Sequence, residues 1–193
     1  YKVTGVQTCA LPISTVTSID QNLGEERTSG IDFDLSYLWR LPHGHSLSLT
    51  NSLVDTIGFT SQQVNGGEFV NYKGRLNVGE YGEGTPVIRD IVSATYAKGP
   101  FSLTWTTRFI DGMKLFDGST DLDCTTSRYC RVNEVFYHDL GATYTWHKFE
   151  FSGGVQNLAD KTPPFVPDAS ENTDPSVYDV VGRLWYLKAR VSF

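Results

Sequence analysis

Residues 31–41 read IDFDLSYLWRL, and this alternating stretch decides the fold of the chain. Every second side chain is apolar, while the positions between carry mainly polar groups such as Asp32, Asp34 and Arg40. Successive side chains of a β-strand point to opposite faces of its sheet. A period of two therefore predicts a strand with one apolar face and one polar face.

The same alternation recurs along the chain and predicts about seven long strands. These expected strands cover residues 24–41, 45–60, 88–98, 101–114, 133–146, 149–158 and 178–193. The connections between them are alternately short and long. Short turns are expected near residues 42–44, 98–100 and 146–148, and long polar loops near residues 61–87, 115–132 and 159–177.

Long loops gathered at one end of long strands are typical of outer-membrane barrels, which have short periplasmic turns and longer extracellular loops. The expected strands also have about the 9–11 residues that a tilted membrane strand needs. The sequence therefore predicts an all-β fold, a fragment of an antiparallel up-and-down transmembrane β-barrel. A fragment is expected because bacterial barrels have an even number of strands, and because open edges in lipid are costly.

The composition excludes two classes of protein. Hydrophobic residues make up 39% of the 193 residues, but no apolar run approaches the roughly 20 residues of a membrane-spanning helix. The net charge of −6 argues against non-specific binding to nucleic acid, which needs a basic surface. A soluble β-sandwich, with its apolar faces in a core, is an alternative that also produces alternation.

The N-terminal stretch VTGVQTCALPI, residues 3–13, resembles a translated sequencing adapter. Residues 1–13 are therefore expected to be an artefact, and the native segment is expected to cover residues 14–193. On this interpretation the native N-terminal part of the protein is missing from the chain.

Three groups of residues resemble motifs in the late barrel strands of TonB-dependent receptors. The first is Asn22-Leu23-Gly24 followed by Thr28-Ser29-Gly30-Ile31-Asp32, the second is the run VQNLADK at residues 155–161, and the third joins Tyr178-Asp179 and Gly182-Arg183 to the terminal Phe193. The resemblance implies that residues 14–193 are the C-terminal part of such a receptor barrel in the bacterial outer membrane.

The resemblance also implies a function and partners. Receptors of this family import scarce nutrients such as iron chelates, cobalamin or saccharides through a plugged barrel. The expected partners are outer-membrane lipid, the nutrient, and the plug domain and TonB complex, which act through the absent N-terminal part. Two alternatives remain open: a passive porin-like channel, which has no plug, and a soluble β-sandwich binding module.

Two sets of residues are assigned roles by this interpretation. The charged residues on the polar strand faces are expected to face the lumen, namely Asp32, Asp34, Arg40, Arg108, Lys188 and Arg190. The last strand resembles the signal that the barrel-assembly machinery reads, carried by Leu187, Ala189, Val191 and Phe193.

Few residues indicate other chemistry. Cys124 and Cys130 are expected to form a disulfide that closes a loop, since the loop holds no histidine to complete a metal site. The four histidines show no metal-ligand spacing, and no catalytic set is present, so neither a cofactor nor an enzyme activity is expected. Carboxylates in the loop at residues 159–177, such as Asp160 and Asp174, support a weaker hypothesis of a cationic ligand.

Overall fold

The computed structural model describes residues 24–62, 66–77, 84–117, 120–167 and 172–192. Seven strands form one long antiparallel sheet, here called the wall sheet, in the order in which they occur along the chain. They are β1 (Glu25–Leu41), β2 (His45–Gln62), β6 (Ile88–Lys98), β7 (Phe101–Ile110), β10 (Val135–Trp146), β11 (Phe149–Gln156) and β12 (Leu184–Val191). The short strand β3 (Val70–Asn71) pairs with β2 beside this path.

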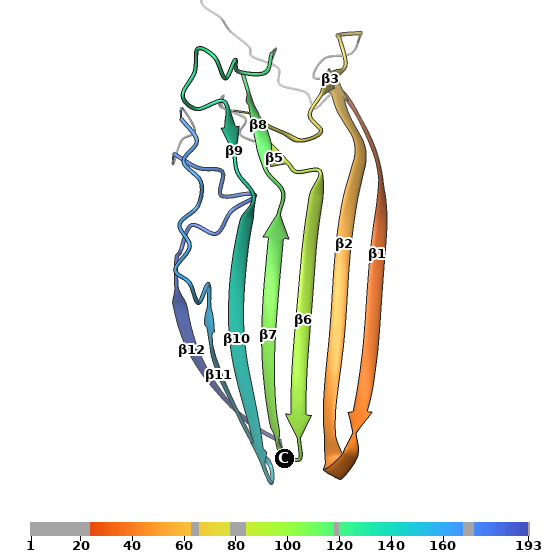
Figure 1. The fold of residues 1–193 in the computed structure, drawn as a ribbon, viewed down its shortest axis with the longest axis vertical. Helices are drawn as coiled ribbons and strands as arrows, with labels where there is room; N and C mark the ends of the chain where they lie inside the picture. Colours follow the sequence, from red (N-terminus) through yellow and green to blue (C-terminus); the bar gives the residue numbers. More distant parts are fainter. Residues whose placement is uncertain (1–23, 63–65, 78–83, 118–119, 168–171, 193) are drawn as a thin grey trace, which may run out of the picture.

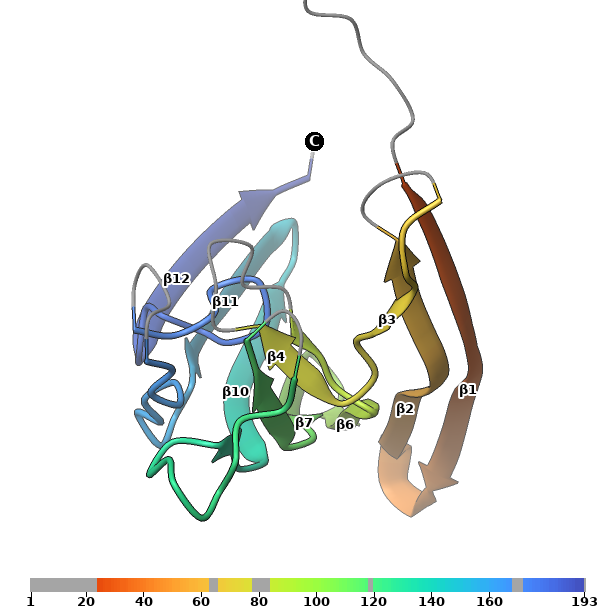
Figure 2. The same cartoon turned by 90° about the horizontal axis from the view of Figure 1, so that it is seen from above.

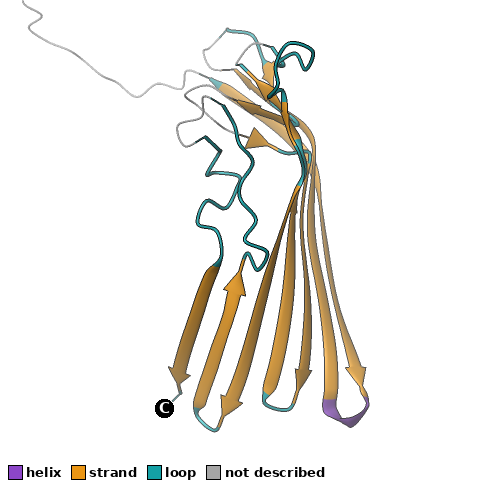
Figure 3. Cartoon of the chain, turned by 60° about the vertical axis from the view of Figure 1, so that its left-hand side comes forward, coloured by secondary structure: helices purple, strands orange, loops and turns teal. Residues whose placement is uncertain are grey.

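The wall sheet is an up-and-down meander in which every short turn lies at one end (Figures 1 and 3). The turns are the 3-10 segment η1 (Pro42–Gly44) and two tight reversals at residues 99–100 and 147–148. Gly44 and Gly99 have φ angles of +76° and +54°, which glycine adopts without steric cost. The long connections all lie at the opposite end (Figure 1).

Seen from above, the wall sheet is curved, and β1 and β12 form its two ends (Figure 2). It is a fragment of an antiparallel up-and-down β-barrel, as the alternation predicts. The stretch 88–98, which alternates least clearly, forms β6 with the expected bounds. Among the described residues, no helix has the length and apolar character of a membrane span.

The strand register divides the wall sheet into a polar and an apolar face. Asp34 lies opposite Ser52, Ser52 opposite Ile91, Ile91 opposite Arg108, and Arg108 opposite Tyr137, so these residues share one face across the sheet. The other face of β1 carries a row of exposed apolar side chains, namely Ile31, Phe33, Leu35, Tyr37 and Trp39. An apolar band of this kind is what a barrel presents to lipid.

A second sheet lies at the end of the long connections and is formed by short strands. Its order is β5 (Gly84–Thr85), β4 (Arg75–Asn77), β8 (Met113–Phe116) and β9 (Arg131–Val132). β4 and β8 pair in parallel, although they belong to different connections. In the view from above, β4 lies on the concave side of the wall sheet (Figure 2).

The second sheet packs on the wall sheet through one apolar cluster. The buried residues are Leu76, Ile110, Met113, Leu115, Val132, Val135, Tyr137, Val166 and Tyr178. Tyr137 belongs to the polar face of the wall sheet, because it is the partner of Arg108. The polar face is therefore the concave one, and the exposed apolar face is the convex one.

Three sequence predictions differ from the structure in detail. The expected strand 101–114 is interrupted, since β7 ends at Ile110 and the chain continues as β8 from Met113. At the interruption Gly112 packs closely on β9, and a side chain there would lie 2.8 Å from the carbonyl oxygen of Val132. The expected strand 178–193 begins only at Leu184, because Tyr178 is buried in the apolar cluster. The long polar loops are partly ordered into the second sheet.

A register shift also moves one aromatic side chain to the other face. Strict alternation along the expected strand 45–60 would place Phe59 on the same face as Leu47, Leu49 and Leu53, but the register shift between Ser29 and Gly30 places it opposite Thr28. Phe59 then packs against Tyr72, with ring centroids 6.2 Å apart, on the side of the second sheet. A bulge has this effect because the extra residue reverses the alternation beyond it.

Candidate functional site

Three cationic side chains lie next to one another across the second sheet. Arg75 of β4 is the register partner of Lys114 of β8, and Lys114 is the partner of Arg131 of β9. We call these three residues the cationic row. The residues that follow them in the chain, Leu76, Leu115 and Val132, are buried in the apolar cluster. The cationic row therefore lies on the opposite face of the second sheet, the face that also carries the buried Phe116, whose ring centroid lies 5.7 Å from that of Tyr72.

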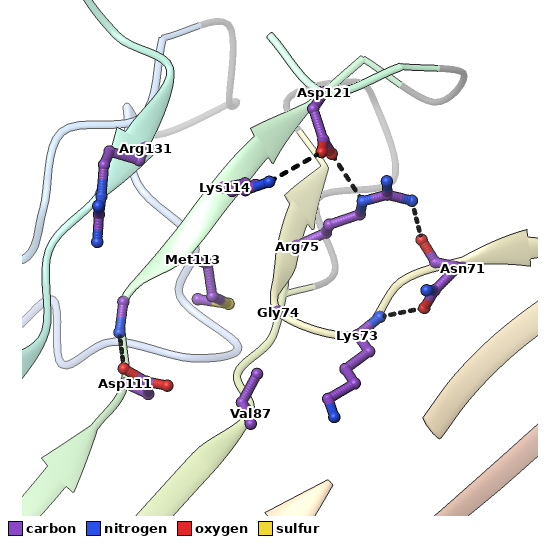
Figure 4. Close-up of a pocket in the computed structure, with 11 residues that line it drawn as sticks. Asn71, Lys73, Gly74, Arg75, Val87, Asp111, Met113, Lys114, Asp121 and Arg131 are labelled. Atoms are coloured by element: carbon purple, nitrogen blue, oxygen red, sulfur yellow. Dashed lines mark hydrogen bonds and ion pairs between the residues drawn. The ribbon is translucent and has the colours of Figure 1, made fainter. Parts of the chain in front are cut away.

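Arg75 is held in place by three contacts, of which those with Asp121 and Asn71 are drawn in Figure 4. Its Nε forms an ion pair with Asp121 at 2.7 Å, and its Nη1 donates a hydrogen bond of 2.5 Å to the carbonyl oxygen of Asn71. Its guanidinium also lies over the ring of Phe116, 5.0 Å from the centroid. The guanidinium is therefore pre-organised, since little rotamer freedom remains to be lost when it binds a ligand.

Asp121 is shared between two members of the cationic row. Its second carboxylate oxygen lies 3.4 Å from Nζ of Lys114, a side chain that is 70% exposed. Arg131 and Lys73 form no ion pair within the described part of the chain. Of these four cations, Arg75 and Lys114 thus share the carboxylate of Asp121, and Lys73 and Arg131 have no carboxylate within 4 Å in the described chain.

These cations line a cavity of about 460 Å³. Its other lining residues are Asn71, Gly74, Val87, Asp111, Gly112, Met113 and Asp121. Asp111 accepts a hydrogen bond of 2.7 Å from the backbone N–H of Gly112. Four cationic side chains face two carboxylates, so the lining carries a surplus of two positive charges on a protein whose net charge is −6.

Comparisons with known proteins identify the family. Residues 2–158 match the family described as "TonB dependent receptor-like, beta-barrel". The chain belongs to this family. The match includes the adapter-like stretch, but residues 1–23 lie outside the described residues, and the assignment of residues 1–13 as an artefact stays a prediction.

A solved structure supports the barrel fold of this TonB-dependent receptor chain. It is a mutant of the ferric enterobactin receptor PfeA from Pseudomonas aeruginosa, with a TM-score of 0.57 and 19% sequence identity. The alignment covers 86% of this chain and 22% of the other. The chain thus spans about a fifth of the length of that receptor. No curated protein matches the chain.

The charged residues expected to face the receptor lumen all lie on the concave face of the wall sheet. The register places Asp32, Asp34, Arg40, Arg108, Lys188 and Arg190 on that face. They do not converge on one site. Asp34 lines a shallow cavity of about 360 Å³ with residues of β1, β2 and β6, and Arg89 lines another of about 310 Å³ nearer the second sheet.

Arg108 has a structural role that the sequence does not indicate. Its Nη2 lies 2.5 Å from a carboxylate oxygen of Asp179, and its Nε lies 3.2 Å from Asp139. Asp139 in turn accepts a hydrogen bond from the backbone N–H of Asn157. The guanidinium therefore joins β7 and β10 to both ends of the last long connection.

The acidic residues of that connection bind backbone groups rather than form an open site. Asp160 accepts a hydrogen bond from the N–H of Arg183, and the buried Asp174 accepts one from the N–H of Gly84. Burial also raises the pKa of the nearby Tyr178 phenol. Asp168 and Glu171, the other two acidic residues, lie outside the described residues. These contacts favour a packing role over the hypothesis of a cationic ligand.

A disulfide joins Cys124 and Cys130, with their Cα atoms 5.0 Å apart. Beside it, hydrogen bonds from the side chain and backbone of Thr125 hold the pKa of the Asp123 carboxyl below its ordinary value. No group of three or more metal-ligating side chains occurs among the residues the structure describes.

The residues of the expected assembly signal lie on the convex face of β12. Leu187 is 87% exposed, and its face also carries Ala189 and Val191. Phe193 lies outside the described residues.

The sequence analysis did not predict the cationic row, because its three residues come from distant segments of the chain. The available signal was that each cation directly precedes an apolar residue.

Proposed function

We propose that residues 14–193 form the C-terminal part of the barrel of an outer-membrane TonB-dependent receptor that imports a scarce nutrient. The observation that carries this proposal is the two-faced wall sheet in a chain of the TonB-dependent receptor family. Its convex face suits lipid, and its concave face would line the lumen, where the plug domain would lie. The nutrient would be an iron chelate, cobalamin or a saccharide, and uptake would be driven by the TonB complex.

The same proposal assigns roles to the residues identified in the sequence. Asp32, Asp34, Arg40, Lys188 and Arg190 would face the lumen, while Arg108 would fix the last connection to the wall. Leu187, Ala189, Val191 and Phe193 would be read by the barrel-assembly machinery. The protein would act as a transporter, without catalysis and without a cofactor of its own.

The structure disfavours both alternatives. A soluble β-sandwich buries its apolar faces against each other, but the apolar side chains of β1 are about half exposed and lie on the convex face. A porin leaves its lumen open, whereas here the second sheet packs on the concave face through the apolar cluster.

Uptake by cells tests the proposal. The full-length receptor gene is expressed in a strain that lacks its own receptors, and growth on candidate iron chelates, cobalamin and saccharides is measured with and without an intact TonB complex. Growth that requires the TonB complex is expected for one of these nutrients. Uptake that persists without the TonB complex indicates a porin and contradicts the proposal, as does recovery of the protein in solution without detergent.

A further inference from the structure

The convex face of the wall sheet carries a group of polar side chains among its apolar ones. Partners in the strand register share a face, so the row that begins at Leu35 on the convex face of β1 can be followed across the sheet. This row contains Leu35, Asn51, Val92, Thr107 and His138. Asp90 lies one row nearer the long connections, between Leu53 and Phe109. We call Asn51, Asp90, Thr107 and His138 the polar strip.

The polar strip is surrounded by apolar side chains. On its two sides, the convex faces of β1, β11 and β12 carry Ile31, Phe33, Leu35, Tyr37, Val155, Trp185 and Leu187. Toward the long connections lie Phe109 and Phe136, with ring centroids 4.9 Å apart. Toward the short turns, the next row contains Trp105 and Leu140. In a membrane this face would meet hydrocarbon, where polar and charged side chains are costly and mark functional sites.

One end of the polar strip is a hydrogen-bond donor. Nε1 of Trp105 donates to Oγ1 of Thr107 at 3.1 Å, and Oγ1 lies 3.0 Å from Nδ1 of His138. With the hydroxyl hydrogen of Thr107 directed to Nδ1, the neutral imidazole carries its proton on Nε2. The chain of hydrogen bonds therefore ends in an N–H group for which the described residues supply no acceptor.

The other end of the polar strip is an acceptor. Nδ2 of Asn51 donates a hydrogen bond to Oδ1 of Asp90, which is half-buried. Asp90 has no cationic partner within 4 Å among the described residues. A carboxylate has lone pairs for several further donors. The polar strip thus offers an acceptor on β6 and a donor on β10, so it is complementary to a second copy of itself.

We propose that the polar strip is the contact surface between two copies of the receptor that lie side by side in the membrane. A two-fold axis along the membrane normal, between β6 and β7, would place β6 of each copy against β7 and β10 of the other. Asp90 of each copy would then accept a hydrogen bond from His138 of the other. The two residues differ by one row, about 7 Å along the strand direction, which is within the combined reach of their side chains.

The width of the polar strip fits such a contact. Two convex walls touch only along a narrow line, and the strands from β2 to β10 span about 14 Å at about 4.8 Å per strand. The inference rests on the proposed function for its membrane setting. It goes beyond that function, because nutrient uptake by a barrel does not require a second copy.

The first experiment uses the full-length receptor in the outer membrane, without other free thiols. Ala94 lies on the convex face of β6, opposite Leu49 and Trp105, and adjoins the polar strip. Ala94→Cys is expected to form a disulfide-linked dimer on mild oxidation, with twice the mass of the receptor. Ala189→Cys is the matched control, because Ala189 lies on the convex face of β12. It should stay monomeric.

The second experiment changes the two ends of the polar strip in the Ala94→Cys receptor. Asp90→Leu and His138→Leu are each expected to reduce the dimer about tenfold, since a charge-assisted bond between the copies is lost. Exchange of the two residues, Asp90→His with His138→Asp, is expected to restore the dimer. His45→Leu is the control, because His45 also lies on the convex face and bonds the Tyr96 hydroxyl, but at the short-turn end. It should leave the dimer unchanged.

Several outcomes overturn the proposal: no dimer of Ala94→Cys, an equal dimer of Ala189→Cys, or a cross-linked product that contains a different protein. A dimer unchanged by Asp90→Leu and His138→Leu restricts the polar strip to contacts within one sheet and also overturns it. Gel electrophoresis before and after heating confirms that each variant is assembled. Nutrient uptake is measured in parallel. Uptake that depends on the TonB complex without any dimer overturns only the contact between copies, whereas absence of the receptor from the membrane overturns the proposed function.

Discussion

The wall sheet and the second sheet differ in how they accommodate their apolar side chains. The wall sheet has long strands, and it leaves its apolar side chains exposed on the convex face, with Leu187 at 87%. The second sheet has strands of two to four residues and buries its apolar side chains completely, with Leu76 and Leu115 at 0%. In the proposed barrel the wall sheet would depend on a lipid environment, while the second sheet depends on the wall sheet.

The largest expected effect comes from adding a side chain at a glycine of the wall sheet that other groups approach closely. Gly154 lies beneath the ring of Tyr186, and an added side chain would meet both this ring and the carbonyl oxygen of Leu140. Gly154→Val is therefore expected to remove most of the assembled receptor from the outer membrane, since overpacking against backbone costs about 1–3 kcal/mol or more. Assembly is measured by gel electrophoresis of the membrane fraction, in which the folded barrel migrates differently before and after heating. Gly153→Ala, whose nearest neighbours would be 3.3 Å away, is the control and should assemble.

A second prediction separates the two sheets. Leu115→Ala removes a fully buried side chain of the apolar cluster and is expected to destabilise the second sheet by about 2–5 kcal/mol. Limited proteolysis should then cut within residues 111–134 while the wall sheet stays assembled. The exposed Leu187→Ala serves as the counterpart and should leave this cleavage unchanged. Loss of assembly in Leu115→Ala would show that the wall sheet depends on the second sheet.

The third prediction tests the two faces of one strand. In the receptor without other free thiols, Lys188→Cys is expected to react with a membrane-impermeant maleimide, because it would face the lumen. Leu187→Cys is expected to react instead with a lipid-soluble reagent. The two residues are adjacent in β12, so their side chains point to opposite faces. Equal labelling of both by the impermeant reagent would contradict the assignment of the convex face to lipid.

The smallest effect concerns the disulfide. Cys124→Ser with Cys130→Ser opens a closed segment with a sequence separation of six, so the loss of stabilisation is expected to be at most about 2–3 kcal/mol and local. Faster proteolysis within residues 120–132, with unchanged assembly, is the expected result. Reduction of the wild type with a thiol should reproduce it, and a change in assembly would contradict the local role.

The contrast between the sheets also explains how far the sequence could be interpreted. In the wall sheet a strand such as β1 alternates along nearly its whole length, so the local pattern alone predicts its bounds to within one residue. β4 and β8 are too short for a period to be detected, and their parallel pairing joins Arg75 to Lys114 across about forty residues of chain. No local rule sets the register of such a pair. The bulge beside Gly30, which redirects Phe59, is equally invisible because it depends on the partner strand.

The parallel pairing of β4 with β8 has a consequence for the exchange of surface segments. Loops that decorate a barrel are normally independent modules, because each connects only its own two strands. Here the segment between β2 and β6 shares a sheet with the segment between β7 and β10. A chimaera that receives one segment without the other would lose the edge on which it folds. Recombination and loop grafting in this receptor would therefore succeed only when both segments are transferred together.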